Sequence, residues 1–207
     1  MKVHDKLEEI LESPGQLRIL RFLYQSPSEH TGRFIAKAVK MSASGAYEII
    51  KKLESKGFLK VTRQGQSCLY QLDHNHYVVK KFLGVLFARE KNIYQDIISL
   101  IKKGLSKAGD CVCAAALFGS VVSKQETALS DIDLVIILND AKKKRFIEDL
   151  TNTLNLKFAS DFHASLEPYI LTQQEFRKKF RQKIKLIQNI VSQNRLILGE
   201  PLERIVA

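Results

Sequence analysis

The sequence has few cysteines and no long apolar run. Its 207 residues include three cysteines, Cys68, Cys111 and Cys113, an odd and sparse set that argues against a disulfide framework and favours reduced thiols. No apolar run approaches the ~20 residues of a membrane-spanning helix, and residues 1–9 lack the apolar core of a signal peptide. We therefore expect a cytoplasmic protein with no membrane partner.

Acidic residues are also scarce relative to basic ones. The 33 Lys and Arg residues against 22 Asp and Glu residues leave a formal net charge of +11. This excess favours an anionic partner, either nucleic acid or a nucleotide, and charge by itself does not choose between them. The length allows one large domain or two small ones, and 45% apolar residues are ordinary for a globular protein.

The most informative pattern joins a Gly-Ser pair to two aspartates. Gly119-Ser120 follows apolar residues, and after a polar stretch Asp131-Ile132-Asp133 enters an apolar, strand-like run. In a strand both aspartates point to one face, which is costly unless a cation lies between them. Mg²⁺ is the natural candidate because it takes one or two carboxylates plus phosphate oxygens. Backbone N–H groups of the Gly-Ser turn can meet those phosphates.

This pattern resembles the nucleotidyltransferases related to DNA polymerase β, in particular their minimal members. The matching segments are Phe118-Gly119-Ser120 and Ser130-Asp131-Ile132-Asp133-Leu134, and the resemblance extends over about residues 93–200. It implies that Asp131 and Asp133 hold one or two Mg²⁺ ions and that Gly119 and Ser120 bind the phosphates of an NTP. A Gly turn followed by two exposed aspartates at a strand end is the alternative.

Two positions depart from the pattern that the resemblance implies. The family places a third acidic residue near Glu167, but two positions earlier, where this chain has Ser165. Either Glu167 substitutes as the third catalytic carboxylate or that carboxylate is absent. The small members also place an Arg and a Gly beyond the Gly-Ser turn, and Lys124 is the residue here that can supply the charge. Asp161, His163, Ser165 and Glu167 share one face if residues 161–171 form a strand throughout.

The first 74 residues predict three helices and a hairpin. Ser13 and Ser42 are expected to cap the first and third helices, and the second is expected to start near Thr31 and to bury Phe34, Ile35, Ala38 and Val39. Gly57 ends the third, and strands 58–63 and 67–72 flank a turn. The segment resembles MarR- and ArsR-type winged helix-turn-helix regulators. That resemblance implies double-stranded DNA as a partner, bound through the following candidates: Ser42, Ala43, Ser44, Tyr47, Lys51, Lys52, Arg63, Gln64 and Gln66.

Other interpretations of this region stay open. Winged helices also mediate protein contacts, and Lys51 and Lys52 also suit a solvated helix face. Residues 75–107 predict a helical connector, which either forms a homodimer or packs on the next domain. Residues 108–207, with a first helix that begins near 93, form the second domain.

The elements expected there are strands 111–118, 131–138 and 165–171, helices 141–154 and 176–191, and a tail from 195. The fold class is therefore α+β, with a winged helix-turn-helix, a helical connector and a mixed sheet with helices on one face.

Two functions follow. The first is Mg²⁺-dependent transfer of NMP from an NTP to an acceptor hydroxyl, by a protein that also binds DNA. The second is a transcriptional regulator whose nucleotidyltransferase domain binds nucleotide without turnover. A weaker third possibility is an antitoxin-like protein paired with a helical partner, a pairing common among minimal nucleotidyltransferases.

Overall fold

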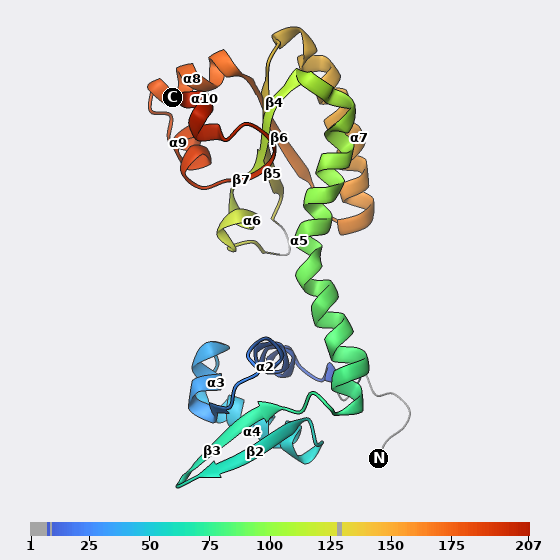
Figure 1. The fold of residues 1–207 in the computed structure, drawn as a ribbon, viewed down its shortest axis with the longest axis vertical. Coiled ribbons are helices and arrows are strands. Elements are labelled where there is room, and N and C mark those ends of the chain that lie inside the picture. Colours follow the sequence, from blue (N-terminus) through green and yellow to red (C-terminus); the bar gives the residue numbers. More distant parts are fainter. Residues whose placement is uncertain (1–7, 9, 128–129) are drawn as a thin grey trace. The chain divides into compact units, whose positions relative to one another are not determined.

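The chain contains two compact units. The computed structural model describes residues 8, 10–127 and 130–207, and the described residues divide into a unit that ends at Ile93 and a unit from Tyr94 to Ala207. The division falls inside one continuous helix, α5 (Gly84–Leu105) (Figure 1). No helix in the described parts of the chain is both long and apolar enough to span a membrane.

Three helices of the first unit begin where capping residues predict. They are α2 (Pro14–Gln25), α3 (Gly32–Ala38) and α4 (Ala43–Ser55). The side chains of Ser13, Thr31 and Ser42 each accept a hydrogen bond from the N–H group three residues later, which satisfies one free donor of each helix. Their buried residues form one core with those of the following hairpin.

The hairpin completes a winged helix. Strands β2 (Leu59–Gln64) and β3 (Ser67–Leu72) are antiparallel, and β1 (His30–Thr31) pairs with the other edge of β3. Within α3 the expectation is wrong for Phe34 and Ala38, which are exposed, whereas Ile35 and Val39 are buried. After the hairpin, a π-helical turn η1 (Val79–Leu83) leads into α5.

A four-stranded mixed sheet organises the second unit. Its order is β6-β5-β4-β7; β5 and β6 are parallel, whereas β4 is antiparallel to both of its neighbours. The elements in chain order are η2 (Ser106–Cys111), β4 (Val112–Leu117), α6 (Ser120–Ser123), β5 (Ile132–Leu138), η3 (Ala141–Lys143), α7 (Lys144–Phe162), β6 (Leu166–Thr172), α8 (Gln173–Arg181), α9 (Lys185–Ser192), β7 (Arg195–Gly199) and α10 (Leu202–Val206).

Helices cover both faces of this sheet, which corrects the expectation of one covered face. Side chains of α7 and the second half of α5 pack with Leu134 and Ile136 on one side. Side chains of α8, α9 and α10 pack with Val135 and Ile137 on the other. Figure 1 shows α7 on one side of the sheet and α8, α9 and α10 on the opposite side. Every residue from Leu134 to Leu138 is buried, and such a continuous apolar run is typical of a strand that is covered on both faces.

The elements after β5 differ from the expected ones in three further ways. The basic helix predicted over 176–191 is two helices, because the chain turns at Gln182–Ile184 with Lys183 in the left-handed region at φ 56°. The expected tail from Arg195 is the edge strand β7, which pairs with β4. The predicted helix from Ala141 continues to Phe162, so the expected strand begins later, at Leu166.

Candidate functional site

Three carboxylates gather where β5 and β6 begin. Asp133 is the second residue of β5, and the parallel register places it directly opposite Glu167 of β6. Asp131 lies two residues before Asp133, just outside the strand. Because equivalent positions on adjacent strands point to the same face, the sheet brings Asp133 and Glu167 together although 34 positions separate them in the sequence.

Gly119 closes this group from the neighbouring strand. The N–H of Phe118 donates to the backbone oxygen of Asp133 at 3.1 Å, which places the Gly-Ser turn beside the start of β5. Gly119 has φ +74°, and a Cβ at this position would overlap Oδ2 of Asp133 and lie 3.0 Å from its Cγ. The absence of a side chain at Gly119 therefore leaves the space that the Asp133 carboxylate fills.

The electrostatics of the group are unfavourable without a counter-charge. Burial raises the pKa of Asp133 above its ordinary value of 3.8, and the negative charges of Asp131 and Glu167 raise it further. Desolvation and repulsion thus both make the ionised form of Asp133 less stable. A cation between these carboxylates reverses both effects.

The donor set fits a hard divalent cation. Asp131 and Asp133 supply carboxylate oxygens, the ligands that Mg²⁺ takes together with phosphate oxygens. Among the residues that the structure describes, no group of three or more His, Cys, Asp and Glu side chains is arranged to hold a metal ion. This arrangement suits a metal ion that a bound triphosphate completes, because Mg²⁺ is usually held by one or two carboxylates and substrate oxygens rather than by an all-protein cage.

Ser165 occupies the position of the missing acidic residue. Its hydroxyl donates a 2.9 Å hydrogen bond to Oε1 of Glu167, and its backbone oxygen accepts from the N–H of Ile132. Ser165 therefore holds Glu167 while it ties the start of β6 to β5. Asp161 and His163 do not share this face: Asp161 belongs to α7, and His163 caps that helix with a left-handed backbone.

The phosphate-binding candidates lie after β4. Ser120 begins α6, a single turn, and Lys124 ends it with φ 57°. The Ser123 hydroxyl donates to the backbone oxygens of Gly119 and Ser120, each at 3.1 Å, and so braces the turn from within. Lys124 is exposed, and its side chain is free to follow a bound phosphate chain. Residues 128 and 129 lie outside the described residues.

A cavity of about 640 Å³ opens beside Ser165, and the sequence alone did not reveal it. It lies between α7 and the start of β6, with Leu156 exposed over 74% of its surface. Its lining combines polar and apolar side chains and carries no carboxylate or ammonium group: Asn152, Asn155, Leu156, Ala159, His163, Ala164 and Ser165. The lining residues come from α7 and from the turn between α7 and β6, and they form no recognisable sequence motif.

The candidate DNA-contacting residues of α4 lie on its exposed side. Ala43, Ser44, Tyr47 and Lys51 are exposed, whereas Ala46, Ile50 and Leu53 face the core. Lys51 lies over the Tyr47 ring with Nζ 5.6 Å from the ring centre, and it also pairs with Glu54 at 2.7 Å. Hydrogen bonding to Glu54 is the main cause that raises the pKa of Lys51.

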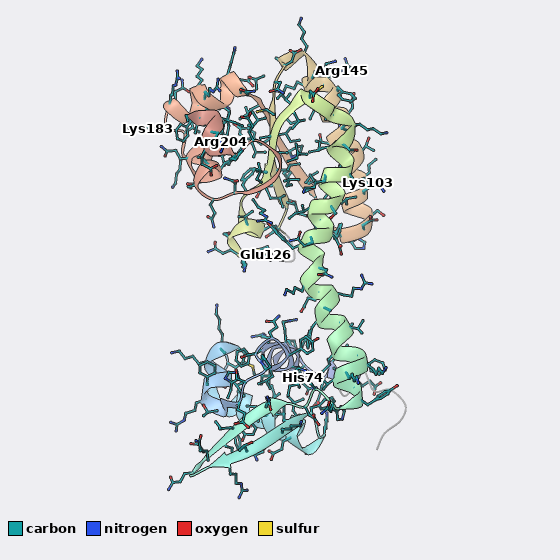
Figure 2. All side chains as sticks on the ribbon, viewed as in Figure 1. His74, Lys103, Glu126, Arg145, Lys183 and Arg204 are labelled. Carbon is teal, nitrogen blue, oxygen red and sulfur yellow. The ribbon has the colours of Figure 1, made fainter. Side chains whose placement is uncertain are left out.

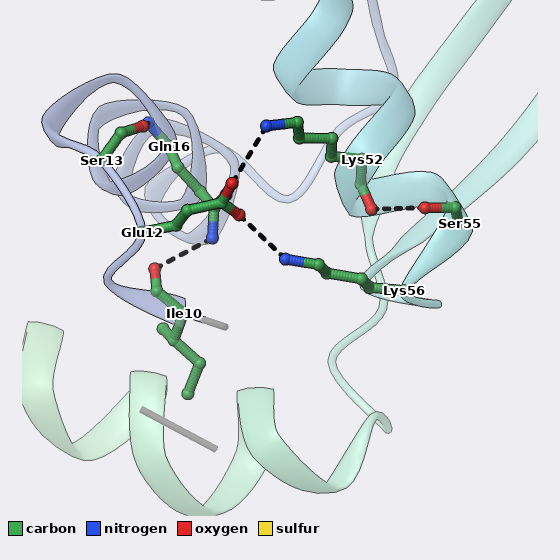
Figure 3. A network of polar contacts seen from close by, with 7 residues as sticks. All are labelled: Ile10, Glu12, Ser13, Gln16, Lys52, Ser55 and Lys56. Atoms are coloured by element: carbon green, nitrogen blue, oxygen red, sulfur yellow. Dashed lines mark hydrogen bonds and ion pairs between the residues drawn. The ribbon is translucent and has the colours of Figure 1, made fainter. Parts of the chain in front are cut away.

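Lys52 and Ser42 have structural partners. Lys52 and Lys56 both pair with Glu12, at 3.0 and 2.9 Å, and so link α4 to the residues before α2 (Figure 3). Both lysines hold the pKa of Glu12 below its usual value through their hydrogen bonds. The Ser42 hydroxyl caps α4 through Gly45.

The wing presents its three candidates to solvent. Arg63 and Gln64 end β2, and Gln66 follows Gly65, whose φ of +59° permits the tight turn. All are exposed. The predicted wing residues are therefore together at the hairpin tip.

Comparison with protein families finds two matches along the chain. Residues 99–201 match the model "Polymerase beta, Nucleotidyltransferase", and residues 13–66 match the MarR family. The first match contains the Gly119–Asp133 and Glu167 group. The second contains α2, α3, α4 and strand β2 of the hairpin, and it ends before β3. A search of curated proteins found no significant match.

Solved structures resemble parts of the chain. NolR from Sinorhizobium fredii is 25% identical, with 39% of this chain and 76% of that chain covered and a TM-score of 0.33. A DNA-binding transcriptional regulator from E. coli is 25% identical, covering 43% and 86%, with a TM-score of 0.35. A toxin-antitoxin structure with AMP-PNP is 19% identical, covering 53% and 80%, with a TM-score of 0.38.

Proposed function

Because the chain joins a MarR-type winged helix to a polymerase-β-type nucleotidyltransferase domain, we propose that it transfers NMP from an NTP to an acceptor hydroxyl with Mg²⁺. The observation that carries this proposal is the packing of Asp133 into the space that Gly119 leaves free, directly opposite Glu167. This packing supports the proposal because it brings together three segments that are separate in the sequence, those of Gly119, Asp133 and Glu167.

Each residue of this site has a role in the proposal. Asp131 and Asp133 hold the metal, which when bound neutralises the phosphates and activates the acceptor hydroxyl. Gly119 lets the backbone approach the triphosphate, Ser120 donates to it, and Lys124 adds positive charge. Phosphoryl transfer depends mostly on positioning and charge neutralisation, so this small set is sufficient.

Glu167 is proposed as the third carboxylate. Its register with Asp133 aims it at the same site, and the Ser165 hydroxyl holds one of its oxygens. The other oxygen remains available to the acceptor hydroxyl or to the metal. The cavity beside Ser165 is the place proposed for the acceptor, since its amides and hydroxyl can bind a polar group without a net charge.

An incubation with labelled NTPs, Mg²⁺ and cell extract tests the transfer. The full-length protein should produce a labelled product, and the Asp131→Asn and Asp133→Asn variants should lose it by at least ~100-fold, as expected when metal ligands are removed. Asp149→Asn, an exposed carboxylate on α7, is the matched control and should keep full activity. If all three variants behave like the wild type, the transfer hypothesis fails.

Nucleotide sensing is the second candidate function. Ser165, where the family places a carboxylate, favours binding without turnover, and the winged helix supplies an output. In this case an NTP binds in a manner that depends on Asp133, no labelled product forms, and the affinity for a DNA site changes when the NTP is added. A DNA affinity that does not respond to salt would contradict the DNA-binding part of both functions.

The remaining proposals concern organisation. DNA would be contacted by the exposed side of α4 and by the hairpin tip, with residues 1–74 as the winged-helix domain, 75–107 as the connector and 108–207 as the nucleotidyltransferase domain. A homodimer would form through the exposed apolar residues that lead into and begin α5, namely Tyr77, Phe82, Val85, Leu86 and Ile93.

A further inference from the structure

The strongest concentration of positive charge lies in the second unit, not in the winged helix. Residues 176–199 contain seven Lys and Arg residues and no Asp or Glu. Two of the seven have contacts that explain them structurally. Arg177 donates from Nε to the backbone oxygen of Ile205, and Lys179 donates to the Tyr169 hydroxyl, both at 2.6 Å.

Five other cations of this segment are exposed. Four of them lie between positions 178 and 185, and we call these the basic surface: Lys178, Arg181, Lys183 and Lys185. Over the described part of the chain, all ion pairs within 4.0 Å use cations of the first unit, and none includes a member of the basic surface. Figure 2 shows Lys183 at the outer edge of the second unit. The basic surface therefore has no internal counter-charge.

Local structure does not account for this charge. The dipole of α8 favours cations in its last turn, which includes Lys178 and Arg181. Lys183 lies beyond that helix, and Lys185 is the first residue of α9, where the same dipole effect disfavours a positive charge. Lys178 and Arg181 are also three residues apart on one helix, where like charges repel. An external anion relieves all of these costs.

The basic surface borders a groove with suitable donors. A cavity of about 430 Å³ is lined by Gln174, Arg177, Lys178, Arg181 and Gln182. Guanidinium groups bind phosphate oxygens in a bidentate manner, and amides add neutral donors and acceptors. This combination is suited to a chain of phosphates rather than to one small anion.

Two other kinds of polyanion fit less well. A membrane-binding helix needs a continuous exposed apolar face. In α8 and α9 the residues Phe176, Ile187 and Ile190 are buried, and the exposed large apolar residues of this segment are two, Ile184 and Leu186, which do not form such a face. Protein interfaces are depleted in lysine, which supplies three of the four exposed cations here. We therefore propose that the basic surface binds the phosphate backbone of a nucleic acid, independently of the winged helix and of the Gly119–Asp133 site.

A matched pair of triple variants of the full-length protein tests this. K178Q/R181Q/K185Q removes three charges from the basic surface, and K102Q/K103Q/K107Q removes three exposed charges from α5 and η2. Figure 2 shows Lys103 on the opposite side of the unit from Lys183. Binding of a fluorescent single-stranded RNA oligonucleotide is measured by anisotropy over a series of NaCl concentrations, because a winged helix reads duplexes. Melting curves confirm that both variants fold.

We expect K178Q/R181Q/K185Q to weaken RNA binding at least ~10-fold and to reduce the slope of log K against log salt by about 2, since each single-strand phosphate contact contributes ~0.7. The control variant should keep the slope of the wild type. Equal losses in both variants would overturn the proposal, as would an absence of wild-type binding to RNA and to duplex DNA.

Two further probes test whether the basic surface binds a different polyanion. Vesicles of phosphatidylglycerol and phosphatidylcholine represent a membrane, and polyglutamate represents an acidic protein. If the wild type binds either of these at least as tightly as RNA, and K178Q/R181Q/K185Q loses that binding, the surface serves that partner and the nucleic-acid proposal is rejected.

Discussion

Gly119 and Asp133 lie so close together that only glycine at position 119 leaves room for the Asp133 carboxylate. A Cβ there would overlap Oδ2 of Asp133, although 14 positions separate the two residues along the chain. The turn that we propose to bind phosphates and the carboxylate that we propose to bind metal are therefore sterically coupled.

Gly119→Ala should abolish nucleotidyl transfer and destabilise the protein by about 1–3 kcal/mol, because the left-handed backbone and the overlap with Asp133 both oppose a side chain. Gly109→Ala is the matched control, since Gly109 also has a positive φ of 50° but a Cβ there meets nothing within 4 Å. Thermal unfolding and transfer assays measure both. Similar effects of the two substitutions would show that the Asp133 contact has no importance.

Asp133→Asn should raise the melting temperature at neutral pH, by about 2–4 °C for each kcal/mol gained. Because burial raises the pKa of Asp133 above 3.8, the folded protein holds this proton more tightly than the unfolded chain. The ionised group therefore lowers stability above its raised pKa, and this penalty disappears below 3.8, where both states are protonated. The advantage of the variant should accordingly vanish as the pH falls through that range.

Added Mg²⁺ with an NTP should stabilise the wild type and not Asp133→Asn, because only the carboxylate binds the cation in the folded state. Asp149→Asn should respond to Mg²⁺ as the wild type does. Melting temperatures with and without the metal and nucleotide measure this. Equal stabilisation of all three proteins would place the metal elsewhere.

Glu167→Gln should reduce kcat by about 100-fold or more if Glu167 acts as a general base, given the usual contribution of such a group. Ser165→Ala should have a smaller effect, because it removes only the hydrogen bond that positions Glu167, and Ser165→Thr should restore activity. Steady-state measurement of kcat for the three variants checks these expectations. An unchanged kcat in Glu167→Gln would contradict the role of a third carboxylate.

Arg63→Ala should weaken binding to all duplexes similarly and reduce the salt slope by about 0.9, the contribution of one phosphate contact. Tyr47→Ala should instead reduce the preference for one DNA site over others, since Tyr47 is on the exposed side of α4. Lys60→Ala is the control for charge, because Lys60 already pairs with Asp73 at 3.2 Å. Anisotropy titrations at several salt concentrations distinguish these outcomes.

Leu86→Glu should shift the protein toward monomer, because Leu86 belongs to the apolar residues proposed to form a dimer and is 45% exposed. Leu156→Glu, at an even more exposed leucine of the second unit, is the control. Sedimentation velocity measures the mass of each variant. A wild type that stays monomeric at high concentration would reject the dimer.

Short-range chemistry made several features predictable from the amino acids alone. Ser13 and Ser42 cap their helices as predicted, because a hydroxyl at the N-cap position can reach the N–H group three residues later. The Gly-Ser and Asp-x-Asp segments likewise identified a domain type, since their spacing reflects a strand, a turn and a second strand, and the family match confirms it.

Features that depend on residues far apart in the chain needed the folded structure. The parallel pairing of β5 with β6 placed Glu167 opposite Asp133, and the Glu12 contacts gave Lys52 a structural partner. The continuous apolar run of β5 is typical of a strand covered on both faces, but which helices form the second layer depends on distant segments. The break at Lys183 was missed because no glycine or proline marks this turn in the sequence. Local patterns therefore determined which elements form, and packing among distant segments decided which side chains meet.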